Sequence, residues 1–135
     1  MLILRVKYLS FFFILVSALS FFNIIYSYYF NLYLNLNTYY LSLISSLIFG
    51  VLFYRIKEIN KKPSIFEKIL TVFLGYILLP LILSIPFYFS IYNLTLLDSI
   101  FESISGFTST GFTIFENIKH IDQGLILWRS SIQWI

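Results

Sequence analysis

The stretch ISGFTSTGFT, residues 104–113, decides the fold that we expect of this chain. It closes a short apolar run with small and hydroxyl-bearing residues around Gly111, and it lies between hydrophobic segments long enough to cross a bilayer. Non-helical backbone at membrane depth is tolerated only where it is buried in protein or lines a water-filled path. Residues 108–113 therefore predict one segment of an ion pore.

The composition places the chain in a membrane. Of its 135 residues, 59% are hydrophobic and 11% are charged, and a soluble domain of this size buries too little surface to hide so many apolar side chains. The sequence has no cysteine, which excludes disulfides and thiolate metal sites, and its single histidine, His120, leaves no ligand cluster for zinc. It also offers no nucleophile–base pair and no phosphate-binding loop, so we expect no catalytic residue, no organic cofactor and no enzyme.

The basic residues predict how the chain crosses the membrane. The net charge is +3, and the lysines and arginines flank apolar runs without the interleaved pattern of a nucleic-acid-binding face, so we expect no nucleic acid. The positive-inside rule predicts a cytoplasmic amino terminus and a cytoplasmic block RIKEINKK at 55–62, with the asparagine-rich link 31–37 outside. The residues behind this prediction are Arg5, Lys7, Arg55, Lys57, Lys61 and Lys62.

Three apolar runs are long enough to span a bilayer. Residues 8–30 carry no charge, and at about 1.5 Å per residue they exceed a hydrocarbon core of about 30 Å. The basic residues before this run also fit a secretory signal peptide, an alternative that the sequence leaves open. Residues 39–54 and 69–91 are the other two spans. Pro80 and Pro86 interrupt the last one, which predicts a kinked helix whose freed carbonyls find partners on neighbouring elements.

Residues 96–107 have a helical pattern but are too short to cross, since about 12 residues of helix reach roughly 18 Å. Thr95 and Asp98 have the S/T-x-x-D/E spacing of a helix start, in which the threonine oxygen caps free amides and the carboxylate meets the positive helix end. We therefore expect a re-entrant pore helix supported by Asp98 and Glu102. Glu102 is expected to pack or hydrogen-bond near the outer vestibule rather than to bind an ion directly.

The loop after this helix has the chemistry of a potassium filter. A potassium ion gives up its water where rings of backbone carbonyls replace it, and glycine reaches the left-handed conformations that turn carbonyls inward. We expect Gly111 to be the pivot and Ser109 and Thr110 to complete the backbone potassium site. Thr108 and Phe112 add flanking carbonyls, and the ring of Phe112 is expected to brace the loop from behind. The negative carboxyl end of the pore helix favours a cation.

Residues 124–135 begin a further apolar segment after a polar loop at 114–123. Trp128 and Trp134 suit a membrane interface or a helix contact, and His120 in the loop is expected to be solvated. Arg129 either pairs with a carboxylate or lines an internal cavity, or it extends its head group to the outer surface, and the sequence leaves these alternatives open. A helix that ends within the bilayer leaves carbonyls without partners, so we expect the natural chain to continue.

Three motifs resemble the first pore loop and following helix of the Trk/Ktr superfamily of potassium uptake proteins, and its TrkH-like membrane subunit in particular. They are Asp-x-x-Phe-Glu at 98–102, Ser-Gly-Phe-Thr-x-Thr-Gly at 105–111, and Leu-Trp-Arg-Ser-x-x-Gln-Trp-Ile at 127–135. Pro86-Phe87-Tyr88 also resembles the end of the helix before the loop. Residues 1–62 match only as a pair of spans that precede the first pore unit.

This resemblance implies an all-α membrane protein with a voltage-gated-like ion channel pore unit, one of four helix–pore loop–helix repeats. Residues 1–62 would be two amino-terminal transmembrane helices, and 63–135 the first repeat, truncated in its second helix. One filter motif is present where the family needs four, so we expect an amino-terminal fragment. The resemblance alone further implies the following: a bacterial inner membrane with its lipid, potassium as the ion, sodium or proton coupling, the missing carboxy-terminal repeats, a full-length homodimer and a cytosolic TrkA-like nucleotide-binding regulatory subunit.

The sequence is compatible with three functions. The first is the amino-terminal portion of a potassium transporter that contributes one selectivity-filter segment. The second is a small cation channel in which four copies of the chain complete the pore. The third is a membrane anchor or accessory protein that conducts no ion.

Overall fold

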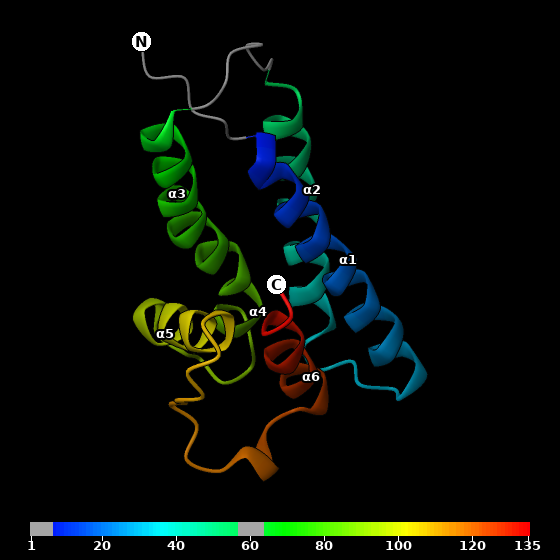
Figure 1. The fold of residues 1–135 in the computed structure, drawn as a ribbon. Helices are drawn as coiled ribbons and strands as arrows, with labels where there is room; N and C mark the ends of the chain where they lie inside the picture. The colour runs from blue at the N-terminus through cyan, green and yellow to red at the C-terminus, as the bar shows by residue number, and fades with distance from the viewer. Residues whose placement is uncertain (1–6, 57–63) are drawn as a thin grey trace.

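The structure is a computed structural model that describes residues 7–56 and 64–135, and every regular element in these ranges is a helix. Three long helices run along the molecule, namely α1 (Lys7–Tyr29), α2 (Leu36–Tyr54) and α3 (Ile65–Leu83) (Figure 1). Four of the basic residues behind the predicted orientation lie outside the described residues: Arg5, Lys57, Lys61 and Lys62.

Length and composition allow three stretches of the described helices to cross a membrane, Lys7–Tyr29, Leu36–Tyr54 and Ile65–Tyr88. The three spans predicted from the apolar runs are therefore present. The second begins earlier than predicted because the chain turns sharply after α1. Asn31 takes a φ of +56° there, and the Leu32 N–H donates to the Ser27 carbonyl at 2.8 Å. A left-handed residue directly after the last turn commonly ends a helix in this way.

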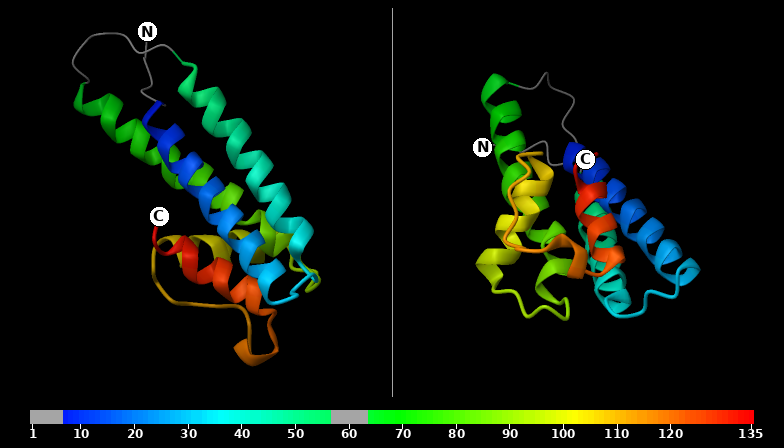
Figure 2. Two further views of the ribbon diagram at one scale, coloured as in Figure 1. Left: turned by 90° about the vertical axis from the view of Figure 1, so that its right-hand side faces the viewer. Right: turned by 90° about the horizontal axis from the view of Figure 1, so that it is seen from below.

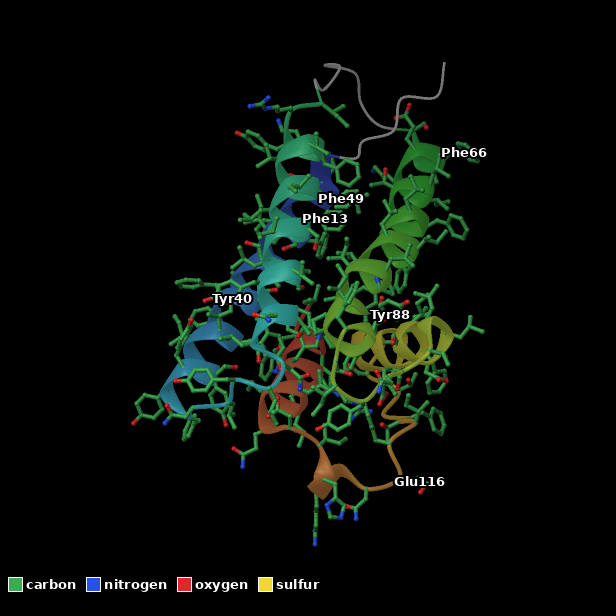
Figure 3. The ribbon with its side chains drawn as sticks, turned by 180° about the vertical axis from the view of Figure 1, so that it is seen from behind. Phe13, Tyr40, Phe49, Phe66, Tyr88 and Glu116 are labelled. Carbon is green, nitrogen blue, oxygen red and sulfur yellow. The ribbon has the colours of Figure 1, made fainter. Side chains whose placement is uncertain are left out.

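Small residues and aromatic rings join α1 to α2. The Ser20 hydroxyl donates to the Ser42 hydroxyl at 3.1 Å between the two helices. Further along, Phe13 and Phe49 stack with their ring centroids 5.8 Å apart (Figure 3). In a bilayer, apolar area does not drive helices together, so close approach at small residues and buried hydroxyl pairs has to supply the contact. The two helices therefore form one antiparallel hairpin.

The third span is broken rather than continuous. The predicted helix 69–91 is two helices, because α3 ends at Leu83 and the short α4 (Ile85–Tyr88) follows. Proline cannot donate a backbone hydrogen bond, so carbonyls near a proline need other partners. The Ser103 hydroxyl donates to the Pro80 carbonyl at 2.9 Å, and the Trp128 indole Nε1–H donates to the Leu83 carbonyl at 3.1 Å. The predicted interruption of the span near Pro80 and Pro86 is confirmed. The bonds from Ser103 and Trp128 reach carbonyls beside the break, of which that of Pro80 also accepts the Ser84 N–H at 2.9 Å, and not the carbonyls four residues before each proline.

The last two helices fold back onto the long ones. α5 (Leu96–Phe107) lies crosswise to α3, and the chain then runs to the end of the molecule through the short 3₁₀-helix η1 (Ile118–His120) (Figures 1 and 2). From there α6 (Gln123–Ile132) turns back and packs against α1, α4 and α5. The segment between α5 and α6 is thus anchored at both ends.

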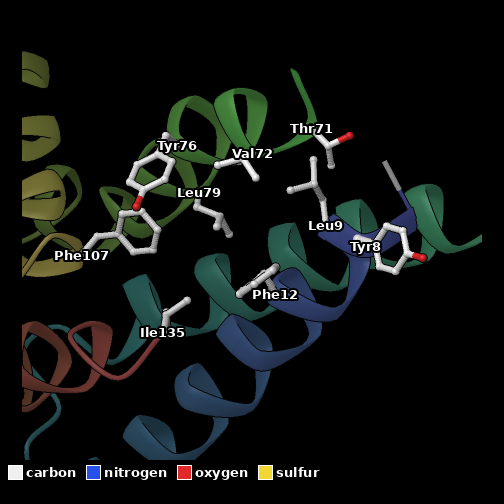
Figure 4. Close-up of a pocket in the computed structure, with 10 residues that line it drawn as sticks. Tyr8, Leu9, Phe12, Thr71, Val72, Tyr76, Leu79, Phe107 and Ile135 are labelled. Carbon is white, nitrogen blue, oxygen red and sulfur yellow. The ribbon is translucent and has the colours of Figure 1, made fainter. Parts of the chain in front are cut away.

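An apolar cavity of about 310 Å³ separates α1 from α3 (Figure 4). Leu9 and Phe12 of α1 face Leu79 of α3 across it, and Phe107 lies at one side. The ring centroids of Phe107 and Tyr76 are 5.4 Å apart. Since Phe107 is the last residue of α5, that helix ends beside the central turns of the third span.

Candidate pore loop

The start of α5 is capped by the two residues that the sequence motif predicts. The Asp98 backbone N–H donates to the Thr95 hydroxyl oxygen at 3.2 Å, and the Thr95 hydroxyl donates to the Asp98 carboxylate at 2.6 Å. Asp98 also places negative charge in the first turn, near the positive end of the helix. The bounds of α5 are those expected from the sequence. Asp98 therefore supports the helix from its amino end, far from the loop.

The loop after α5 takes two left-handed backbone conformations. Gly111 has a φ of +81°, and a Cβ built on it would meet no atom within 4 Å. Ser109 has a φ of +55°, which is uncommon for a residue with a side chain. The left-handed conformation predicted for Gly111 is present. Conformation, and not lack of space, is therefore what requires glycine at this position.

Ser105 in the last turns of α5 holds the loop at several points. The Thr110 backbone N–H donates to the Ser105 carbonyl at 3.1 Å, and the Thr110 hydroxyl donates to the Ser105 hydroxyl at 3.1 Å. The Ser105 hydroxyl in turn donates to the carbonyl of Phe112. The Thr108 hydroxyl adds a bond to the Ile104 carbonyl at 2.7 Å. The hydroxyls of Thr108 and Thr110 thus bond inward, to the helix.

Most of the predicted filter carbonyls take no part in this bonding. Within the described residues, the carbonyl oxygens of Thr108, Ser109, Thr110 and Gly111 accept no hydrogen bond. All four residues are exposed. The hydroxyls therefore anchor the loop while these carbonyl oxygens stay available to water or to an ion.

A buried ion pair lies behind the loop and joins α5 to α6. Glu102 is fully buried, and its Oε1 lies 3.4 Å from Nε of Arg129, whose side chain is 20% exposed. The Thr113 hydroxyl donates to the same Glu102 oxygen. Arg129 Nη2 donates to the Phe112 carbonyl at 2.9 Å. Of the alternatives left open for Arg129, the structure shows the carboxylate pairing, and Glu102 faces protein groups.

Phe112 differs from its predicted role in one respect. Its ring is 71% exposed and does not brace the loop from behind, so that expectation was wrong. Its carbonyl accepts hydrogen bonds from Ser105 and Arg129, which occupy both lone pairs of the oxygen. The backbone of Phe112, and not its ring, fixes the end of the loop. The bonds from Ser105 and Arg129 to it, and that from Thr113 to Glu102, could not be read from the sequence, because no local spacing encodes them.

Close packing of α6 on α5 sets the position of this network. A Cβ added at Gly106 would lie 2.5 Å from Cδ1 of Ile132, closer than real side chains approach. Of the two tryptophans that suit a membrane interface or a helix contact, Trp128 is fully buried among the helices, whereas Trp134 is 85% exposed. With Ile132 in this position, glycine at position 106 allows the close approach of the two helices at which Arg129 reaches Glu102.

Known proteins match parts of this chain, although no family model and no solved structure does. An uncharacterized cation transporter of Methanocaldococcus jannaschii is 30% identical over 107 residues, which cover 78% of this chain and 23% of that protein. The Trk system potassium uptake protein TrkI of Halomonas elongata is 42% identical over 57 residues, 42% of this chain and 10% of its own length.

A third relative, the Trk system potassium uptake protein TrkH of Escherichia coli, is 36% identical over 69 residues. That match covers 50% of this chain and 14% of TrkH. The chain is related to the Trk potassium uptake proteins. It spans about a quarter or less of the length of each of these three relatives. Their names are those of transporters and not of enzymes.

Proposed function

We propose that this chain contributes one selectivity-filter segment to a path for potassium ions across a membrane. The observation that carries the proposal is the depth of the loop. Phe107, directly before it, contacts Tyr76, and Tyr76 lies midway along the apolar stretch Ile65–Tyr88. A helix that ends at that level, followed by non-helical backbone, describes a re-entrant pore helix. The match to Trk potassium uptake proteins supports potassium as the ion.

The chemistry of the loop fits a weakly hydrated cation better than an anion. The free carbonyl oxygens of Thr108, Ser109, Thr110 and Gly111 offer dipoles like those that replace the hydration shell in potassium filters. They follow the carboxyl end of α5, where the helix dipole is negative. We propose that these four carbonyls face the ion. The fifth predicted carbonyl, that of Phe112, takes the supporting role that its bonds to Ser105 and Arg129 indicate.

One loop covers one side of an ion, so the path needs further filter segments. We propose that residues 63–135 form one of four repeats, preceded by two amino-terminal spans in 1–62, and that carboxy-terminal repeats of a longer Trk-type protein supply the others. Four copies of this chain are the alternative source. The assembly that we propose lies in a bacterial inner membrane with a cytoplasmic amino terminus, as a homodimer with a cytosolic TrkA-like nucleotide-binding regulatory subunit.

Single cysteines test the loop directly, because the chain has none of its own. Ser109→Cys in proteoliposomes should react with a water-soluble thiol reagent, and potassium should slow this reaction more than sodium does once further filter segments complete the ion site. Glu116→Cys in the outer loop is the matched control, since Glu116 extends from the end of the molecule (Figure 3) and should react equally in both salts. A Ser109→Cys protein that is unreactive, or that stays equally reactive in both salts when all filter segments are present, would contradict the proposal.

Ion flux then separates the two sources of the remaining filter segments. If four copies complete the pore, proteoliposomes that contain only this chain should take up potassium, and Gly111→Asp should abolish the uptake. If a longer protein is required, the chain alone should show neither uptake nor potassium protection, and protection at Ser109→Cys should appear once the remaining repeats are supplied.

A further inference from the structure

A group of buried polar side chains lies where α1, α2 and the start of α6 meet, away from the filter loop. Asn23 and Ser27 lie one turn apart on the same face of α1. Tyr39 comes from α2, and Asp122 directly precedes α6. Asn23, Ser27 and Tyr39 are at least 99% buried. Four oxygen-bearing side chains from three elements are thus enclosed together.

Three of these side chains lack a hydrogen-bond partner. Asn23 Oδ1, Ser27 Oγ and the Tyr39 hydroxyl bond to no other described group. Burying polar atoms without partners costs free energy, so native proteins rarely keep several in one place. Three such atoms together therefore indicate a bound partner that is not part of the chain.

Three of these oxygens lie close to Gly124. A Cβ built on that glycine would lie 2.9 Å from the Tyr39 hydroxyl, 3.1 Å from Asp122 Oδ2 and 3.4 Å from Ser27 Oγ. Any larger residue at position 124 would therefore press against these oxygens. Glycine lets the three elements bring them close together.

The charge of this group of side chains is negative. Asp122 Oδ2 accepts one hydrogen bond, from Asn35 Nδ2 at 3.2 Å. Among the described residues no lysine, arginine or histidine pairs with Asp122, and the nearest arginine along α6, Arg129, is engaged with Glu102. The amino end of α6 offsets only part of a full negative charge.

We propose that Asp122, Tyr39 and Ser27, with Asn23 one turn away, form a binding site for a monovalent alkali cation, distinct from the filter loop. Every donor is an oxygen, which is the ligand type that hard cations prefer. One carboxylate balances a single positive charge, whereas protein sites for divalent cations gather more anionic ligands. The cation ties the hairpin of α1 and α2 to the helix that carries Arg129.

Trp128 provides a local signal for this site. Its ring centroid lies 6.3 Å from that of Tyr39, and the chain has two tryptophans. With Trp134→Phe as background, emission therefore reports on Trp128 alone. We expect sodium or potassium chloride, added to the chain in lipid nanodiscs in place of choline chloride, to change this emission saturably and to raise the thermal midpoint. The salt with the lower half-saturating concentration identifies the preferred ion.

Variants distinguish the site from general stability. Asp122→Asn should raise the half-saturating concentration at least tenfold. Ser27→Ala and Tyr39→Phe remove hydroxyls that have no protein partner, so they should lower the thermal midpoint in alkali salt and leave it unchanged or higher in choline. Ser20→Ala is the matched control, because its hydroxyl bonds to Ser42 and its loss should cost the same in both salts.

Three results would overturn the proposal. The first is a response no larger in alkali salt than in choline, which indicates a buried water only. The second is a change in thermal midpoint for Ser27→Ala and Tyr39→Phe that is the same in alkali salt and in choline. This comparison tests the cation site even if Asp122→Asn does not fold. The third is loss of the Trp128 response in Gly111→Ala, since that would assign the effect to the filter loop.

Discussion

Removing either partner of the buried pair between Glu102 and Arg129 should destabilise the loop, and the two losses should differ. At 3.4 Å and an effective dielectric constant of 20, the attraction amounts to about 5 kcal/mol. Desolvation of the fully buried carboxylate offsets much of this, and the partial exposure of Arg129 reduces it further. We expect Glu102→Gln to cost about 2 kcal/mol, because the amide can still accept the Thr113 hydroxyl.

Arg129→Gln should cost more, about 3 kcal/mol, because it leaves the fully buried charge of Glu102 without a cation. The measurement is reversible unfolding in mixed micelles of dodecylmaltoside and sodium dodecyl sulfate, followed by helical circular dichroism. The double variant should be more stable than the sum of the two losses predicts, by about 2 kcal/mol. Glu116→Gln is the control, since this exposed glutamate should change stability by less than about 0.5 kcal/mol.

Two outcomes would refute this reasoning. Losses that add to within about 0.5 kcal/mol would show that the two side chains do not interact. A larger loss for Glu102→Gln than for Arg129→Gln would show that the carboxylate is not the more deeply buried charge. Either result would also contradict the role that we assign to Arg129, which is to hold the Phe112 carbonyl in place.

Three further changes test single contacts. Gly111→Ala places a side chain at a φ of +81°, which should cost about 1–2 kcal/mol and reduce potassium protection at Ser109→Cys while helical content stays constant. Gly106→Ala should cost about 1–3 kcal/mol in the same unfolding assay by overpacking, and Ile132→Val in the same chain should recover part of the loss, because the added Cβ meets the Ile132 side chain. Thr95→Ala should destabilise α5 by about 1 kcal/mol, whereas Thr95→Ser should keep the cap, as amide hydrogen exchange across α5 would show.

Features set within one or two helical turns could be predicted from the sequence. The start of α5 followed from the Thr95 and Asp98 spacing, because a cap depends only on residues in the first turn. The three spans followed from apolar length, since the bilayer fixes how much helix is needed. The left-handed conformation of Gly111 followed from the absence of a Cβ.

Features that join separate elements could not be predicted in this way. The sequence left Arg129 with more than one alternative, and only the close approach of α6 to α5 at Gly106 brings it to Glu102. The break after Leu83 was expected as a kink, but the donor that satisfies its carbonyl, Trp128, comes from a distant helix.

The sequence by itself determined which segments are helices, which of them can span a membrane, and where a non-helical loop with a glycine pivot must lie. The tertiary structure decided which carbonyls of that loop stay free and which one, at Phe112, is held by Ser105 and Arg129. It also showed the ring of Phe112 to be exposed, against expectation. The physical reason is that local spacing fixes backbone conformation within a few residues, whereas hydrogen bonds and ion pairs between elements depend on how closely whole helices pack.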